Sequence, residues 1–111
     1  MSLITRQGHV TVVTLNQPLR QEAVDEISSR IDDAMRDGIP NLVMDLSQTP
    51  LIDGAGLQWL DDLDMEAADR GGCVRLCNAN ELCIDILRMT GVGDRLDHYP
   101  SLPAAMASFV R

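Results

Sequence analysis

The chain contains no lysine and very few aromatic residues. Its 111 residues include nine basic side chains, all of them arginine, and the aromatic side chains are Trp59, Tyr99 and Phe109. A core of this composition is built from leucine, isoleucine, valine, methionine and alanine. No apolar run approaches the roughly 20 residues that cross a membrane, and no basic start followed by an apolar run marks a secretory signal. We therefore expect a cytoplasmic protein that does not insert into membranes.

Positive charge is also scarce relative to negative charge. The formal net charge is −8 at pH 7. An acidic surface repels phosphate backbones, so this balance argues against direct binding of nucleic acid. It fits a protein partner with a basic surface, or solubility alone.

Metal and disulfide chemistry have little support in the sequence. The spacing of Cys73, Cys77 and Cys83 is not that of a common zinc site. Cys73 and Cys77 also fall on one expected strand, which disfavours a disulfide between them. The two histidines, His9 and His98, are isolated at opposite ends of the chain. We expect free, mostly buried thiols in a reducing compartment, no metal site and no cofactor.

Hydrophobic periodicity predicts strands that alternate with helices. Two short strands are expected around Gly8, within residues 4–15, and further strands at residues 41–46, 73–77 and 95–97. Helices are expected at residues 21–36, 56–70, 81–90 and from 101 or 102 to 110. This order implies an α/β fold with crossover helices, in which the first two strands pair antiparallel and the others parallel. We expect a single domain over residues 1–111, with a mixed sheet of about four to five strands flanked by about four helices.

The internal helices have apolar faces that should cover the sheet. In the second helix this face consists of Leu57, Leu60, Leu63 and Ala67, and in the third of Leu82, Ile86, Leu87 and Met89. Carboxylates crowd the second helix, at Asp61, Asp62, Asp64, Glu66 and Asp69. Because no buried histidine or loop spacing of ligands accompanies them, we interpret them as a solvated face. The sequence predicts no catalytic residues.

Residues 51–57, Leu-Ile-Asp-Gly-Ala-Gly-Leu, connect an expected strand to an expected helix. A helix N-terminus at this place in an α/β fold commonly meets ligands. Asp53 is expected to cap the helix, while Gly54 and Gly56 permit positive φ and close backbone approach. A nucleotide site is disfavoured, because Trp59 takes the place of the third glycine of a dinucleotide fingerprint and no phosphate-loop motif is present. The loop of Asp53, Gly54, Ala55 and Gly56 is instead predicted to bind a partner.

Trp59 is the single tryptophan of the chain. At about 100° per residue, it falls at the edge of the apolar face of the second helix or outside it. Two interpretations stay open: an exposed hot spot for a partner, or packing against a neighbouring helix.

Several motifs together resemble the STAS domain family, in the order and spacing of that family over nearly the whole chain. They begin with the strand Leu42-Val43-Met44-Asp45-Leu46 and the loop Asp53-x-x-Gly56-Leu57. They continue with Arg70-Gly71-Gly72-Cys73-Val74-Arg75-Leu76 and end with Ile86-Leu87-Arg88-Met89-Thr90-Gly91-Val92. More narrowly, the chain is similar to the small, single-domain anti-sigma factor antagonists.

The resemblance implies a sheet with flanking helices and a kinase-like anti-sigma factor as the partner. In that family the kinase phosphorylates a serine or threonine directly after the loop aspartate, which breaks the complex. Here Gly54 matches the phosphoacceptor and Ala55 the next hydroxyl position, so no phosphoacceptor is present. The family often has Gly-x-Leu-Asp before the first helix, whereas this chain has Arg20 at the acidic position.

These matches predict a protein-interaction module that is never phosphorylated at the usual loop position. Arg20, Trp59 and Thr90 are its candidate interface residues beside the Asp53 loop. The alternative is an accessory subunit of a membrane transporter of the phospholipid ABC type, because STAS domains also accompany transporters.

Overall fold

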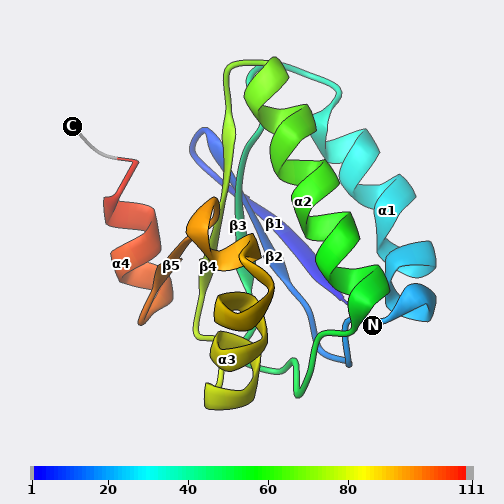
Figure 1. The fold of residues 1–111 in the computed structure, drawn as a ribbon. Helices are drawn as coiled ribbons and strands as arrows, with labels where there is room; N and C mark the ends of the chain where they lie inside the picture. The colour runs from blue at the N-terminus through cyan, green and yellow to red at the C-terminus, as the bar shows by residue number, and fades with distance from the viewer. Residues whose placement is uncertain (1, 110–111) are drawn as a thin grey trace.

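The computed structural model describes residues 2–109, in which strands and helices alternate (Figure 1). In chain order the elements are β1 (Leu3–Gln7), β2 (Val10–Thr14), α1 (Gln21–Met35), β3 (Asn41–Asp45), α2 (Gly54–Asp69), β4 (Cys73–Cys77), α3 (Glu81–Thr90), the 3-10 helix η1 (Val92–Asp94), β5 (Asp97–Tyr99) and α4 (Leu102–Ala107). The predicted order of strands and α-helices is confirmed.

The sheet has five strands in the order β1-β2-β3-β4-β5. β1 and β2 pair antiparallel, from Leu3 opposite Thr14 to Gln7 opposite Val10. The pairs β2–β3, β3–β4 and β4–β5 are parallel. The predicted α/β fold with a mixed sheet is therefore confirmed. Because β2, β3 and β4 are parallel neighbours, their carboxyl ends meet at one edge of the sheet.

The helices are divided between the two faces of the sheet. Figure 1 shows α1, α2 and α3 on one face and α4 on the other. Each of the first three connects two neighbouring parallel strands, and right-handed crossovers put such helices on one face. α4 follows β5 and contacts β3, β4 and β5.

Alternating side chains of the strands build a core on each face. Val13, Met44 and Leu76 belong to the larger core, which α1, α2 and α3 cover. Val12 and Val43 belong to the smaller core, which includes Ala105 of α4. Apolar side chains thus occupy both faces of the sheet.

Three boundaries differ from the sequence-based expectation. α2 begins at Gly54 rather than at residue 56, because Asp53 caps the helix at that point. β5 covers Asp97–Tyr99 rather than residues 95–97, because Leu96 is buried in the larger core ahead of the strand. α4 ends at Ala107, where the hydroxyl of Ser108 bonds a helix carbonyl. Residue 110, the expected end, lies outside the described residues.

The cysteines are free, as predicted, and two of the three are buried. Burial raises the pKa of Cys77 to about 12. It also raises the pKa of Cys83, whose Sγ lies near the Thr49 carbonyl. Only a thiolate is a good nucleophile, so at neutral pH these thiols act as small apolar side chains.

Candidate functional site

The loops that lead into α1 and α2 are joined at the edge where β2 and β3 end. Leu19 and Ile52 form a parallel bridge. The N–H of Leu19 donates to the carbonyl of Leu51 at 2.9 Å, and the N–H of Asp53 donates to the carbonyl of Leu19 at 3.1 Å. Arg20 and Asp53 directly follow the two bridged residues. The structure therefore brings two of the predicted site positions to one place, although Arg20 and Asp53 are 33 residues apart in the chain.

Asp53 fixes the start of α2. Its backbone is extended, with φ −99° and ψ −174°, and its carboxylate accepts from the N–H of Gly56 at 3.0 Å. The predicted cap is confirmed. Gly54 and Ala55 consequently lie in the first helical turn, where Gly54 is exposed and Ala55 half-buried. Neither Gly54 nor Gly56 adopts the positive φ that glycine permits, because both residues are helical.

The two glycines of this turn have different surroundings. A Cβ on Gly56 would lie 2.3 Å from the carbonyl oxygen of Leu19, which is far inside van der Waals contact. The predicted close backbone approach is therefore real at Gly56, where it allows the two loops to touch. A Cβ on Gly54 would meet no atom within 4 Å. Position 54 thus accepts a side chain and would present it to solvent.

Arg20 occupies the N-cap position of α1, yet its side chain makes no capping hydrogen bond. It is exposed. Within residues 2–109, no ion pair includes it. A cation near a helix N-terminus opposes the positive end of the helix dipole. Arg20 therefore places a positive charge beside the Asp53 loop without stabilising the helix that it begins.

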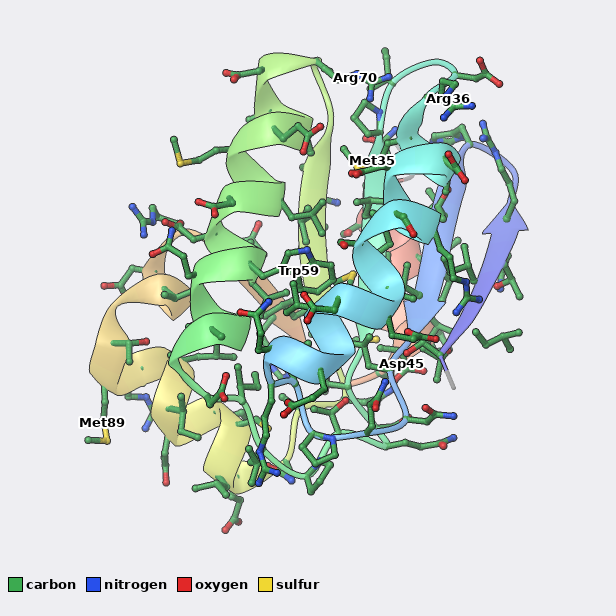
Figure 2. The ribbon with its side chains drawn as sticks, turned by 90° about the vertical axis from the view of Figure 1, so that its right-hand side faces the viewer. Met35, Arg36, Asp45, Trp59, Arg70 and Met89 are labelled. Carbon is green, nitrogen blue, oxygen red and sulfur yellow. The ribbon has the colours of Figure 1, made fainter. Side chains whose placement is uncertain are left out.

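Trp59 lies on a different side of α2 from the loop. Figure 2 shows its side chain between α1 and α2. It is half-buried and packs against the larger core. Of the two interpretations from the sequence, packing against a neighbouring helix describes the bulk of this side chain. Only its exposed part is available to a partner.

Thr90 lies at the far end of α3 from the loops. Its hydroxyl donates to the carbonyl of Ile86 at 2.8 Å and is 3.3 Å from that of Leu87. The helix is closed by Gly91 in the left-handed conformation, with φ 79°. At 1.5 Å per residue, Thr90 is about 14 Å along the axis from the first residue of α3. It is exposed but is not brought together with Arg20 and Asp53.

Helix α3 has an exposed apolar stripe that hydrophobic periodicity did not predict. Leu82 and Met89, expected in the core, are 53% and 85% exposed, and Ile86 between them is half-buried. Cys83 and Leu87 are the buried residues instead. Both sets have helical spacing, so periodicity alone did not separate them. We call Leu82, Ile86 and Met89 the α3 stripe; Figure 2 shows Met89 extending from the molecule.

The α3 stripe begins at the end of α3 that is tied to the segment before Asp53. The side chain of Asn80 caps α3 and donates to the carbonyl of Pro50 at 3.1 Å, which ties this helix to the loop. Ile84 lines a cavity shared with His98 of β5. At about 100° per residue, Leu82 and Ile84 point in nearly opposite directions. The stripe thus extends the loop surface with apolar side chains.

The carboxylates of α2 are not one solvated face. Asp61 is 19% exposed and pairs with Arg95 at 2.8 Å. Asp64 accepts from the N–H of Val74 in β4 at 3.4 Å, and burial raises its pKa. Both were expected in solvent, but they lie on the side of α2 toward η1 and β4. The remaining three, Asp62, Glu66 and Asp69, are exposed as predicted.

Along residues 2–109, no helix combines the length and the apolar character needed to cross a membrane. In the same part of the chain, no three side chains of histidine, cysteine, aspartate or glutamate are grouped so that they could hold a metal ion.

The chain is similar to proteins of a known family. The family model of the STAS domain matches residues 2–105. Comparison with curated proteins gave no significant match.

Solved structures share the fold at low sequence identity. An anti-sigma factor antagonist from Mycobacterium paratuberculosis has a TM-score of 0.86 at 20% identity, over 97% of this chain and 92% of that one. The anti-sigma factor antagonist SpoIIAA in its unphosphorylated form has a TM-score of 0.82 at 16% identity, over 97% and 95%. The murine anion transporter Slc26a9 has a TM-score of 0.79 at 21% identity, over 94% of this chain but 18% of the transporter.

Proposed function

The chain belongs to the STAS domain family, and on that premise we propose that it is a non-enzymatic interaction module of the anti-sigma factor antagonist type. Residues 1–111 act as one domain in the cytoplasm. The partner is a kinase-like anti-sigma factor or a related regulatory protein, and the chain does not bind nucleic acid directly. Binding is not controlled by phosphorylation at the usual loop position.

The observation that carries this proposal is the environment of Gly54. It is exposed at the start of α2, and a side chain there would extend into open space. A kinase could therefore reach a hydroxyl at this position, but glycine provides none. A phosphoserine would add roughly −1.5 to −2 charges. Without it, the protein stays in the form that binds its partner.

The proposed contact surface combines the Asp53 loop with the α3 stripe. The loop supplies polar backbone and the positive charge of Arg20, while Leu82 and Met89 supply exposed apolar area. An apolar centre with a polar rim is the usual composition of a specific interface. Trp59 and Thr90 lie at the margins of this surface.

A capture experiment tests the surface. The wild-type chain, Gly54→Glu and the double variant Leu82→Ser/Met89→Ser are immobilised, and lysate of the source cell is passed over each. Mass spectrometry identifies the bound proteins, and the affinity of the purified partner is then measured. We expect a kinase-like protein on the wild type and about a tenfold or greater loss of affinity for both variants, because one adds repulsion and the other removes apolar contact.

Ser29→Glu is the matched control. It adds the same charge to an exposed position of α1 away from the loop, and binding should be unchanged. If Gly54→Glu binds as tightly as the wild type, the loop is not part of the interface and the proposal fails.

Labelling by the captured kinase tests whether the loop lacks a phosphorylation site. We expect no phosphate on residues 51–57, which contain no hydroxyl group. Thr49 is buried, with its hydroxyl donating to the carbonyl of Leu15 at 3.1 Å. Any label should therefore map to an exposed hydroxyl such as Ser47 or Thr90, and label on residues 51–57 would contradict the assignment.

A second candidate function is that of an accessory subunit of a membrane transporter, of the phospholipid ABC type. The likeness to a segment of the murine anion transporter supports it, since the same fold serves there inside a transport protein. In the capture experiment, an ATPase or a permease on the wild-type chain in place of a kinase-like protein would favour this function.

A further inference from the structure

A cavity lies on the side of α3 opposite the α3 stripe, outside the proposed contact surface. Its volume is about 250 Å³, and its lining residues come from α3, η1 and β5 with the segment between them: Ile84, Leu87, Arg88, Asp94, Leu96 and His98. This is smaller than the roughly 300–1,000 Å³ of sites for drug-sized ligands. The size fits a small metabolite.

The base of the cavity is apolar. Leu87 and Leu96 are 4% and 1% exposed and belong to the larger core, and Ile84 is half-buried beside them. Branched aliphatic side chains of this kind favour an aliphatic group on the ligand, since its burial removes apolar surface from water.

His98 adds a hydrogen-bond donor of defined orientation. Its Nε2 accepts from the backbone N–H of Ala79 at 3.2 Å. Partial burial lowers the pKa of His98, which favours the neutral ring. A neutral ring that accepts at Nε2 carries its proton on Nδ1. Within residues 2–109, no group accepts from that N–H.

The cavity also has one charge of each sign. Arg88 and Asp94 both line it and are exposed. The nearest carboxylate to the guanidinium of Arg88 belongs to Asp85, at 4.0 Å, and an exposed pair at that distance contributes little. Asp94 enters none of the ion pairs found in residues 2–109. Both charges are available to a ligand.

We propose that this cavity binds a zwitterionic α-amino acid with a branched aliphatic side chain. Arg88 and the N–H of His98 hold the carboxylate, Asp94 holds the ammonium group, and Ile84, Leu87 and Leu96 receive the side chain. The arrangement combines an apolar base with a few convergent polar groups, which is the general form of a small-molecule site. The inference does not depend on the identity of the protein partner.

Titration of the full chain with L-leucine, followed by amide NMR, tests the proposal. We expect saturable shifts confined to residues 79–98 at concentrations up to about 10 mM. Two analogues remove one charge each: 4-methylpentanoate lacks the ammonium group, and 3-methylbutylamine lacks the carboxylate. Each should bind about tenfold more weakly than L-leucine, since each loses a charge-assisted contact.

Paired variants assign the charges. Arg88→Gln should weaken L-leucine and 4-methylpentanoate about tenfold and leave 3-methylbutylamine unchanged. Asp94→Asn should weaken L-leucine and 3-methylbutylamine and leave 4-methylpentanoate unchanged. Arg36→Gln and Asp33→Asn are the matched controls, because they alter an exposed pair at the end of α1, away from the cavity, and should change nothing.

Three results would overturn the proposal: no shifts at about 10 mM L-leucine, shifts centred on residues outside the cavity, or equal binding of L-leucine and both analogues. The last would mean apolar contact without recognition of the zwitterion. Arg88 and Asp94 are exposed, so their replacement leaves the fold intact. A loss of ligand binding can then be attributed to the lost charge.

Discussion

The starts of α1 and α2 lie side by side but are built differently. At α2, the carboxylate of Asp53 caps the helix by accepting the N–H of Gly56 at 3.0 Å. At α1, Arg20 stands in the equivalent position and makes no capping hydrogen bond. The two starts share one backbone bridge, between Leu19 and Ile52. The side chain of Asp53 therefore has a structural role, whereas the side chain of Arg20 has none.

In the candidate interface, the residues that fix the shape of the loop are therefore different from the residues that set its charge. The cap and the bridge fix where the loop lies, and they require Asp53 and Gly56. The charge that a partner meets is set by Arg20 and by position 54, where a change of side chain disturbs no contact. Substitutions in the first pair should alter stability, and substitutions in the second pair should alter binding.

The strongest way to break the shared bridge is Gly56→Ala. Its Cβ would lie 2.3 Å from the Leu19 carbonyl oxygen, so the loops must separate. We expect the free energy of unfolding to fall by about 2 kcal/mol. Gly54→Ala is the matched control: its Cβ meets nothing, and the better helix propensity of alanine should raise stability by about 0.5 kcal/mol. Urea denaturation measures the free energy of unfolding of both variants. Equal effects of the two substitutions would contradict the expected difference between Gly56 and Gly54.

Removing the two N-cap side chains sharpens the comparison. Asp53→Ala should lower the free energy of unfolding by about 1 kcal/mol, since the N–H of Gly56 loses its acceptor. Arg20→Ala should change it by less than about 0.5 kcal/mol, because an exposed side chain without a structural contact is lost. Thermal melts of both variants at one pH measure the two losses of stability. A large loss in Arg20→Ala would mean that Arg20 stabilises the fold after all.

A small gain in stability is expected from making the two helix starts alike. Arg20→Asp should supply the missing cap and place a negative charge at the N-terminus of α1. We expect a gain of about 0.5 kcal/mol in the free energy of unfolding. Arg20→Gln removes the charge without supplying a carboxylate, and it should give less than half of that gain. Binding of the captured partner should weaken in both variants if Arg20 faces it.

Local rules were sufficient to predict the order of strands and helices. Val10, Val12 and Val43 are typical of buried strands. Asp53, Asn80 and Ser101 are residue types that favour helix N-caps, and each caps a helix in the structure. The start of α2 was misplaced, because glycines lower helix propensity in the interior but cost little in the first turn, whose N–H groups have no helical acceptor.

Two features of the site depend on contacts that no local rule contains. The bridge from Leu19 to Ile52 joins segments from two separate crossovers, so sequence spacing could not indicate that Arg20 lies beside Asp53. On α3, Cys83 and Leu87 compete with Leu82 and Met89 for the buried face, and only the position of the helix over the sheet decides between them. The same applies to Asp61, which meets Arg95 through the path of the chain after α3.

The open space around Gly54 also has an evolutionary consequence. A glycine codon can become a serine codon by a point mutation, and the added Cβ would meet no neighbouring atom within 4 Å. Neither the cap nor the bridge would need to change. A lineage could therefore gain or lose sensitivity to a kinase without passing through a poorly folded intermediate, and a designer could install the same control in this chain.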